Sequence, residues 1–338
     1  MKVVPTYDFF NDNTPLLDVR SPAEFTSGHI LGAISFPLFT DVERADVGTL
    51  YKQMSREAAI KRGLELIGPK MVSMIEQAES LNSRTFRLYC WRGGMRSRSV
   101  AWLLETYGFN CQVLEGGYKS YRKTTNELIE DELKLIVLSG LTGTRKTAIL
   151  KALKEKGEQV IDLENLAGHQ GSSFGNLENT EQPSTEQFHN LIFDSCRNLD
   201  SNRPVWIEDE SFMIGRCALP QSLYNLKESS PHIVLDIPLE ERIDHLVKGY
   251  GEADPDLLVE ATERIRKKLG HERTDKAIEL IVEGELKRAA EIILKYYDKN
   301  YLYSRSEKKA NMKVVSFKGD QPSSIASTLI KMNYEEVS

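Results

Sequence analysis

Cysteine is scarce in this sequence of 338 residues. The four cysteines, Cys90, Cys111, Cys196 and Cys217, are widely separated and form no Cys-x-x-Cys pair. This spacing argues against a disulfide framework and offers no zinc-binding pattern. Free thiols persist in a reducing cytoplasm, where we expect the protein to act.

Long apolar runs and an excess of basic residues are also missing. No stretch approaches roughly 18 apolar residues, and the N-terminal MKVVPTYDFFNDN has no apolar signal core, so we expect a soluble, unexported protein with no membrane partner. Lys and Arg number 44 against 50 Asp and Glu, a net charge of −6. This balance argues against a surface coated for nonspecific nucleic-acid binding, although a local basic face is compatible with it. No internal repeat or low-complexity tract is evident.

The composition, 40% apolar and 28% charged, is ordinary for a globular chain long enough for two domains. Strand-like apolar runs alternate with helical ones, which predicts an α/β fold. A polar, mixed-charge stretch at 122–134 is expected to be a helical boundary, so we predict domains at 1–125 and 126–338. The first domain is expected to contain strands at 15–20, 86–90 and 111–117 and helices from 21 and over 96–108.

The second domain is predicted to begin with a buried strand at 133–140 that leads through a turn into a helix. Three more strand candidates follow, and the region from about 255 to 300 is long, charged and helical. These strand candidates are QVIDL (159–163), PVWIEDE (204–210) and HIVLDIP (232–238).

The stretch RLYCWRGGMRSRS (87–99) places a thiol in a loop prepared for an anion. Cys90 follows a predicted strand and precedes a predicted helix, and Arg96 lies six residues after it. A thiolate is the nucleophilic form of cysteine and is stabilised at a helix N-terminus and near arginine. Gly93 and Gly94 allow backbone N–H groups to turn inward, while Arg96 can grip an oxyanion with two donors. The pattern predicts attack on a chalcogen or phosphorus atom; the alternative is a buried structural cysteine.

A second anion site is predicted at GLTGTRKT (140–147), which follows a strand and opens a helix as a P-loop does. Lys146 and backbone N–H groups of the loop would hold phosphate oxygens, and Thr147 would bind Mg²⁺. Arg145 stands where a P-loop normally has glycine, which questions ATP or GTP hydrolysis more than phosphate binding. Asp209, at a Walker-B-like strand end, is a candidate to hold Mg²⁺ through water or simply a solvated acid. The predicted phosphate-binding residues are Gly140, Thr142, Gly143, Lys146 and Thr147.

Two stretches of the first domain resemble the rhodanese family. They are LLDVRSPAEFTSGHILGAISFP (16–37) and VLEGGYKSYR (113–122), and the resemblance covers roughly residues 1–125. It implies that Asp18 and Arg20 form a structural pair and that His29 supports the same motif. Tyr89 occupies the position before the cysteine where cysteine phosphatases normally have histidine, so that class is disfavoured. The loop is one residue longer than in sulfur-handling rhodaneses, which implies room for a larger atom or group.

Five stretches in order resemble the tRNA 2-selenouridine synthase family over nearly the whole chain. The resemblance implies an α/β protein with an N-terminal rhodanese-like domain and a C-terminal P-loop NTPase-like domain with added helices. Arg145 and Gln170 depart from the family pattern. The five stretches are CWRGGMRSRSVAWLL (90–104), LTGTRKT (141–147), ENLAGHQGSSFG (164–175), QPSTEQF (182–188) and WIEDESFMIG (206–215).

The resemblance implies a transferase with two steps on the wobble uridine of tRNA. The sulfur of 2-thiouridine is first alkylated with a geranyl group from geranyl diphosphate, and the S-geranyl group is then replaced by selenium from selenophosphate. It further implies the anticodon loop of tRNA and a supplier of selenophosphate as partners, no tightly bound cofactor, and Mg²⁺ as a candidate ion. The implied catalytic residues are Cys90, Arg92 and Arg96, and the implied substrate-binding residues are Gly93, Gly94, Trp91, His169, Ser172 and Ser173.

The other parts of such a site are less specific in the sequence. Phe174, Phe212 and Met213 are candidates for a prenyl pocket, with a core position favoured. The basic clusters at 263–270 and 304–314, with Arg84, Arg87 and Arg98, are candidate tRNA contacts, and Trp91 is a candidate to stack on the base.

Two alternatives stay open, a second kind of enzyme and a binding module. One is a thiosulfate-type sulfurtransferase with a regulatory nucleotide-binding domain, which would transfer sulfur without tRNA. The other is a module that senses nucleotide or tRNA and whose thiol is incidental.

Overall fold

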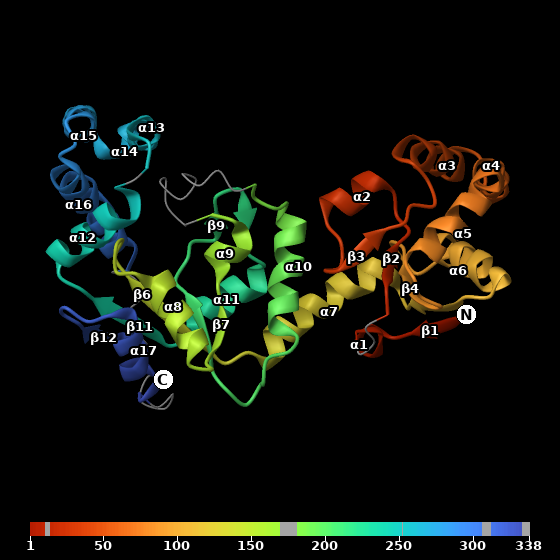
Figure 1. Cartoon of the computed structure of the whole chain (residues 1–338), viewed down its shortest axis with the longest axis horizontal. Helices are drawn as coiled ribbons and strands as arrows, with labels where there is room; N and C mark the ends of the chain where they lie inside the picture. The colour runs from red at the N-terminus through yellow and green to blue at the C-terminus, as the bar shows by residue number, and fades with distance from the viewer. Residues whose placement is uncertain (11–13, 170–180, 252, 306–311, 333–338) are drawn as a thin grey trace. The chain divides into compact units, whose positions relative to one another are not determined.

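The chain folds into two compact α/β units, Met1–Glu127 and Leu128–Ser338 (Figure 1). The computed structural model describes residues 1–10, 14–169, 181–251, 253–305 and 312–332. The helix expected at the boundary is present as α7, Gly117–Glu132. The predicted α/β fold class is confirmed.

The first unit is built on a sheet of five parallel strands in the order β1-β5-β4-β2-β3. Strands β2 and β4 are central and buried on both faces, as their continuous apolar runs predict. The elements of this unit, apart from α7, are β1 (Lys2–Val4), α1 (Thr6–Phe9), β2 (Leu16–Asp18), α2 (Pro22–Ser27), β3 (Ala33–Ser35), α3 (Asp41–Gln53), α4 (Arg56–Ile67), a 3₁₀ turn (Gly68–Lys70), α5 (Met71–Ser80), β4 (Thr85–Tyr89), α6 (Met95–Tyr107) and β5 (Asn110–Leu114).

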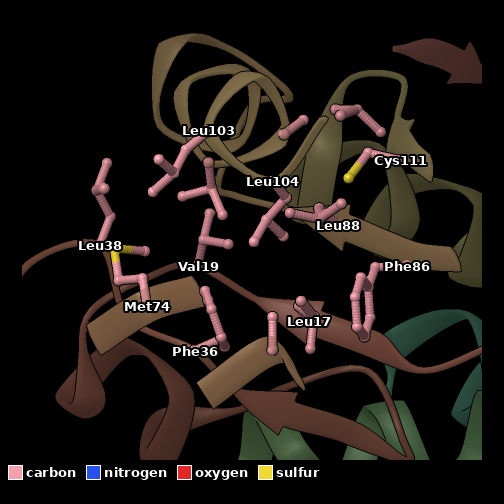
Figure 2. Close-up of a cluster of buried hydrophobic side chains, with 14 of the residues drawn as sticks. Leu17, Val19, Phe36, Leu38, Met74, Phe86, Leu88, Leu103, Leu104 and Cys111 are labelled. Carbon is pink, nitrogen blue, oxygen red and sulfur yellow. The ribbon is translucent and has the colours of Figure 1, made fainter. Parts of the chain in front are cut away.

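The core of the first unit lies between this sheet and the helices α5 and α6. Figure 2 shows Leu17 and Leu88 of the central strands pointing toward the same cluster as Leu103 and Leu104 of α6. The helix α6 stops at Gly108, whose φ of 109° is the left-handed conformation that glycine adopts without strain. The helix predicted over 96–108 is therefore confirmed.

The second unit contains another parallel five-stranded sheet, in the order β12-β11-β6-β8-β7, and a short antiparallel hairpin. Its central strand β6 carries the predicted P-loop. The elements are β6 (Leu135–Gly140), α8 (Lys146–Glu155), β7 (Gln159–Ile161), α9 (Leu163–Ala167), α10 (Thr185–Cys196), β8 (Val205–Glu208), β9 (Met213–Ile214), β10 (Cys217–Ala218), α11 (Gln221–Ser229), β11 (His232–Asp236), α12 (Leu239–Tyr250), α13 (Pro255–Arg264), α14 (Arg266–Leu269), α15 (His271–Val282), α16 (Leu286–Arg305), β12 (Met312–Ser316) and α17 (Pro322–Ile330).

The long helical region predicted from about 255 to 300 is a group of helices rather than one. In it, α15 packs against both α13 and α16, and α16 packs against α12 (Figure 1). Glycines at 270 and 284, both with positive φ, mark two of the turns between these helices. None of the helices in the described part of the chain is both long enough and apolar enough to cross a membrane.

A fully buried ion pair ties the loops of the first unit together. Asp18 and Arg20 are 0% and 1% exposed, and the guanidinium makes forked hydrogen bonds of 2.6–3.1 Å to the carboxylate. Arg20 also donates to the carbonyl of Gly28 at 2.6 Å and lies over the Tyr118 ring. Burial disfavours the charged guanidinium, but the hydrogen bonds and charge of Asp18 outweigh it and raise the pKa of Arg20. The pair has the structural position that the rhodanese resemblance implies.

Removing Arg20 should therefore destabilise the protein strongly. Arg20→Ala leaves the Asp18 carboxylate buried without a counter-charge, and we expect a loss of about 3–5 kcal/mol in the free energy of unfolding. Urea titration followed by circular dichroism measures this loss. The control is Arg62→Ala, which removes an exposed arginine that pairs with Asp46 and should change little. Equal losses in the two variants would contradict the structural role of the buried pair.

Candidate functional site

The predicted nucleophile lies where the sequence places it, between β4 and the N-terminus of α6. Cys90 is 3% exposed, and its Sγ lies 3.2 Å from Oγ of the buried Ser97. Ser97 in turn donates to the carbonyl of Gly94 at 3.3 Å. Ser97 is a neighbour of the thiol that sequence analysis missed. A serine two residues into the helix that follows the cysteine loop is the sequence feature that could have indicated this neighbour.

Glycines hold the cysteine loop against the segment after β5. The backbone N–H groups of Tyr118 and Lys119 donate to the carbonyls of Cys90 and Trp91, each at 2.9 Å. Gly117 has a φ of 62°, and a Cβ there would overlap the Cys90 carbonyl oxygen. Gly93 has the same φ, and its Cβ would lie 2.5 Å from another carbonyl. The cysteine loop thus meets one of the two stretches that carry the rhodanese resemblance, residues 113–122, and glycines on both sides permit that contact.

Arg96, which is predicted to bind an oxyanion, is paired with a carboxylate in this structure. Its guanidinium donates to Glu24 at 2.7 and 3.3 Å. Burial raises the pKa of Glu24, but hydrogen bonds and attraction from Arg96 outweigh that effect and lower it overall. An anion beside Cys90 would therefore compete with Glu24 for this arginine. Sequence analysis missed Glu24, which lies in α2, 72 residues from its partner.

A cavity of about 800 Å³ opens beside Cys90, between its loop and the helices α3 and α4. Four arginines line it, Arg44, Arg56, Arg92 and Arg96, together with apolar side chains of both helices. Trp91 lines the same cavity, is 37% exposed, and lies 5.8 Å from the Tyr118 ring. Gly94 also lines the cavity, whereas Gly93 packs below it. This space exceeds what a small anion alone requires, in line with the larger loop inferred from the sequence.

The second predicted anion site is a loop between β6 and α8. Lys146 donates from Nζ to the carbonyl of Gly140 at 3.2 Å, so it folds back over the loop. Thr144 donates to the carbonyl of Leu141 at 2.8 Å, which closes the turn. Gly143 has a φ of 86°, and a Cβ there would lie 2.8 Å from the Arg242 carbonyl oxygen. The predicted strand, loop and helix of a P-loop are all present.

Arg145, at the position where a P-loop normally has glycine, adopts a left-handed backbone that glycine favours. Its φ is 61°, and its guanidinium donates to the carbonyl of Asp320 at 2.6 Å. The side chain is thereby tied to the segment between β12 and α17. The arginine thus has a left-handed backbone and a structural partner of its own.

Carboxylates crowd the α8 end of the P-loop. Thr147 donates to Glu164 at 2.8 Å, and Glu208 accepts from the Glu164 backbone N–H at 2.5 Å. Burial is the main cause of a raised pKa at all three glutamates. It raises the pKa of Glu164, raises the pKa of Glu208 far above its ordinary value, and raises the pKa of Glu210 to about 7. Hydroxyl and carboxylate oxygens suit Mg²⁺, so Thr147 with Glu164 and Glu210 have the chemistry to hold it. Among the described residues, no group of three or more His, Cys, Asp or Glu side chains forms a ready metal site.

Asp209, the acid predicted to assist Mg²⁺, has other partners. One carboxylate oxygen accepts from the buried Lys227 at 3.1 Å and the other from Ser139 at 2.8 Å. Burial opposes its ionisation, but Lys227, His232 and Ser139 together lower its pKa to about 2. Glu164 accepts a hydrogen bond from Thr147, and Glu210 lies in the electrostatic field of Lys146. Neither acid stands out in the sequence from the other acids of the second domain.

Of the other residues predicted to bind substrate, some lie in the described part of the chain and others lie outside it. His169 ends the α9 turn, with its backbone N–H donating to Glu164, and burial lowers its pKa. Ser172, Ser173 and Phe174, with Gln170, lie outside the described residues. Phe212 and Met213 are 37% and 49% exposed, so the core position favoured for them is wrong.

The candidate tRNA contacts are partly engaged in the protein itself. Arg87 is 9% exposed and donates to the carbonyls of Phe9 and Thr14, so it acts in the fold rather than at the surface. In the cluster at 263–270, Arg266 pairs with Glu263 and Asp275. Most of the cluster at 304–314 lies outside the described residues.

Comparison with known proteins covers both units. Residues 7–124 match the model of the rhodanese-like domain, and residues 133–333 match that of the tRNA 2-selenouridine synthase AAA domain. Curated proteins named tRNA 2-selenouridine synthase are similar throughout. That of Shewanella denitrificans is 33% identical over 95% of this chain and 96% of its own, and that of Pseudomonas fluorescens is 34% identical over 89% and 91%. That of Bdellovibrio bacteriovorus is 39% identical over 72% and 66%.

The raised pKa of Glu210 predicts a pH-dependent cost to stability. Because this pKa is about 7 in the folded chain and ordinarily 4.5, the stability of the folded state falls as pH rises through that interval. Glu210→Gln removes the charge, so without metal ions it should gain ~1–2 kcal/mol of stability at pH 8 and little at pH 5. Thermal unfolding at both pH values measures this. Glu155→Gln, at an exposed position of α8, is the control, and an equal gain at both pH values would contradict the prediction.

Proposed function

The chain belongs to the tRNA 2-selenouridine synthase family, and we propose that it converts 2-thiouridine at the wobble position of tRNA to 2-selenouridine. The observation that supports this most is the pairing in one chain of an arginine-lined cysteine cavity with a P-loop. We place the reaction in the cytoplasm, with tRNA as the macromolecular substrate and a selenophosphate-forming enzyme as the supplier.

The first step is alkylation of the thiocarbonyl sulfur by geranyl diphosphate. The sulfur forms a bond to C1 of the geranyl chain, the C1–O bond breaks, and diphosphate leaves with the electron pair, while the N3 proton passes to solvent. The leaving group requires a cradle of N–H donors and cations, which the P-loop, Lys146 and Thr147 supply. Mg²⁺ held by Thr147 and the nearby glutamates would neutralise further charge on the diphosphate.

The second step replaces the alkylated sulfur with selenium. Alkylation makes the sulfur a better leaving group, because it departs from C2 as geranyl thiol. Hydroselenide derived from selenophosphate adds to C2, the C2–S bond breaks, and water takes up the phosphoryl group as phosphate. The cavity beside Cys90 offers Arg92 and Arg96 for the anionic donor and has space for the base as well.

Replacing the thiol should separate the two steps. Cys90→Ala removes the thiol that lines the cavity assigned to the selenium donor, so the selenation rate should fall at least ~100-fold while geranylation continues. Purified protein is incubated with 2-thiouridine-bearing tRNA and either geranyl diphosphate alone or with selenophosphate, and the digested nucleosides are weighed. Cys111→Ala, which removes a buried cysteine of the core, is the control. Wild-type selenation by the Cys90 variant would refute a catalytic role for this thiol.

Replacing the P-loop lysine should stop the first step. Lys146→Ala removes a cation from the diphosphate site, and we expect geranylation to fall by about 100-fold or more. The same nucleoside assay measures it. Lys151→Ala, on the exposed side of α8, is the matched control. Transfer of sulfur to cyanide without any change in tRNA would instead support the thiosulfate sulfurtransferase.

A further inference from the structure

An apolar cavity in the second unit adjoins the P-loop. It lies among the helices α12, α13, α15 and α16. Its volume of about 90 Å³ is enough for a narrow chain several carbons long. Its wall includes one residue of the P-loop, Thr142. The wall also includes Leu246, Val247, Leu258, Ala290, Ile293 and Tyr297.

The chemistry of this wall selects for hydrocarbon. Apart from Thr142 and two tyrosines, every lining side chain is aliphatic. A nucleobase placed here would lose its hydrogen bonds to water and find few replacements, which costs more than its burial returns. A branched alkyl chain has no such requirement and gains from leaving water.

The helices that form the cavity are fixed to the P-loop by direct contacts. Arg242 of α12 donates to the Thr142 carbonyl at 3.1 Å and pairs with Asp298 of α16 at 2.7 Å. His245 lies 3.3 Å from the Gly143 carbonyl oxygen, and the closeness of Gly143 to α12 permits these contacts. The phosphate loop and the apolar cavity are therefore adjoining parts of one unit.

We propose that this cavity binds the hydrocarbon chain of the prenyl diphosphate while the P-loop binds its diphosphate. The assignment rests on the proposed function and specifies its donor, because a ligand that fills both places has an anionic head and an apolar tail. It places the chain away from Phe212 and Met213, whose exposed positions offer no enclosed wall. Thr142 marks the junction between head and tail.

A bulky side chain in the cavity should weaken binding of the prenyl chain and leave binding of the diphosphate group unchanged. In Ala290→Phe, a ring occupies space on the α16 wall, so the affinity for geranyl diphosphate with Mg²⁺ should fall at least ~10-fold, while that for inorganic diphosphate should stay within about 2-fold. Isothermal titration of the full-length protein measures both. Val282→Phe, on an exposed position of α15, is the control and should change neither.

A second variant protects the test against misfolding of the first. Val247→Ala widens the cavity and should raise the affinity for farnesyl diphosphate relative to geranyl diphosphate by about 3-fold or more. Wild-type geranyl diphosphate affinity in a folded Ala290→Phe protein, or an unchanged chain-length ratio in Val247→Ala, would overturn the assignment.

Failure of the proposed function gives a different result. Wild-type protein would then bind neither geranyl diphosphate nor inorganic diphosphate, which would overturn the tail site together with the P-loop role. Binding of both ligands with equal affinity would overturn the tail site alone.

Discussion

Both candidate sites depend on one constraint, the contact of backbone with backbone at the carboxyl edge of a parallel sheet. In the first unit Gly117 lies against the Cys90 carbonyl, and in the second Gly143 lies against that of Arg242. Any side chain at either position would separate the two segments. Strand order brings the loops to the same edge, and glycine then lets them approach closely enough to share hydrogen bonds. The cysteine loop is thus held by main-chain hydrogen bonds, and the P-loop by a close main-chain approach together with hydrogen bonds from Arg242 and His245.

Charge at the two sites is arranged in opposite ways. Beside Cys90, arginines outnumber acids, and Arg96 pairs with the partly buried Glu24, where the hydrogen bond and charge of the arginine outweigh burial and lower the pKa of the carboxylate. Beside Lys146, acids are in excess, and burial raises the pKa of Glu164 and of Glu210, so the folded chain loses stability when these acids ionise. Such a cost is characteristic of a site that a cation relieves. The first arrangement therefore suits an incoming anion, and the second suits an anion that arrives with Mg²⁺.

Sequence alone predicted the parts of this molecule that depend on local pattern. The buried strands β4, β6 and β8 and the helix α6 were identifiable because their apolar runs and glycine stops are local signals. The strands β1 and β3 were missed because each has only three residues and is half exposed, so neither has a continuous apolar run. The neighbours Glu24 and Glu164 were missed for another reason. Their partners lie 72 and 17 residues away, and an acid at a strand end or in a first helical turn has the same sequence context whether or not a cation lies opposite.

Arg145 shows why a departure from a motif has to be judged by geometry. The position requires a left-handed backbone, which a non-glycine residue adopts at a cost of roughly 1–2 kcal/mol. The hydrogen bond from its guanidinium to the Asp320 carbonyl offsets part of that cost. That bond also connects the P-loop to the segment before α17, so the arginine stabilises the loop from outside. A glycine would make the same turn without strain but could not form this connection. The substitution is therefore compatible with a phosphate-binding loop, and it links that loop to the C-terminal part of its unit.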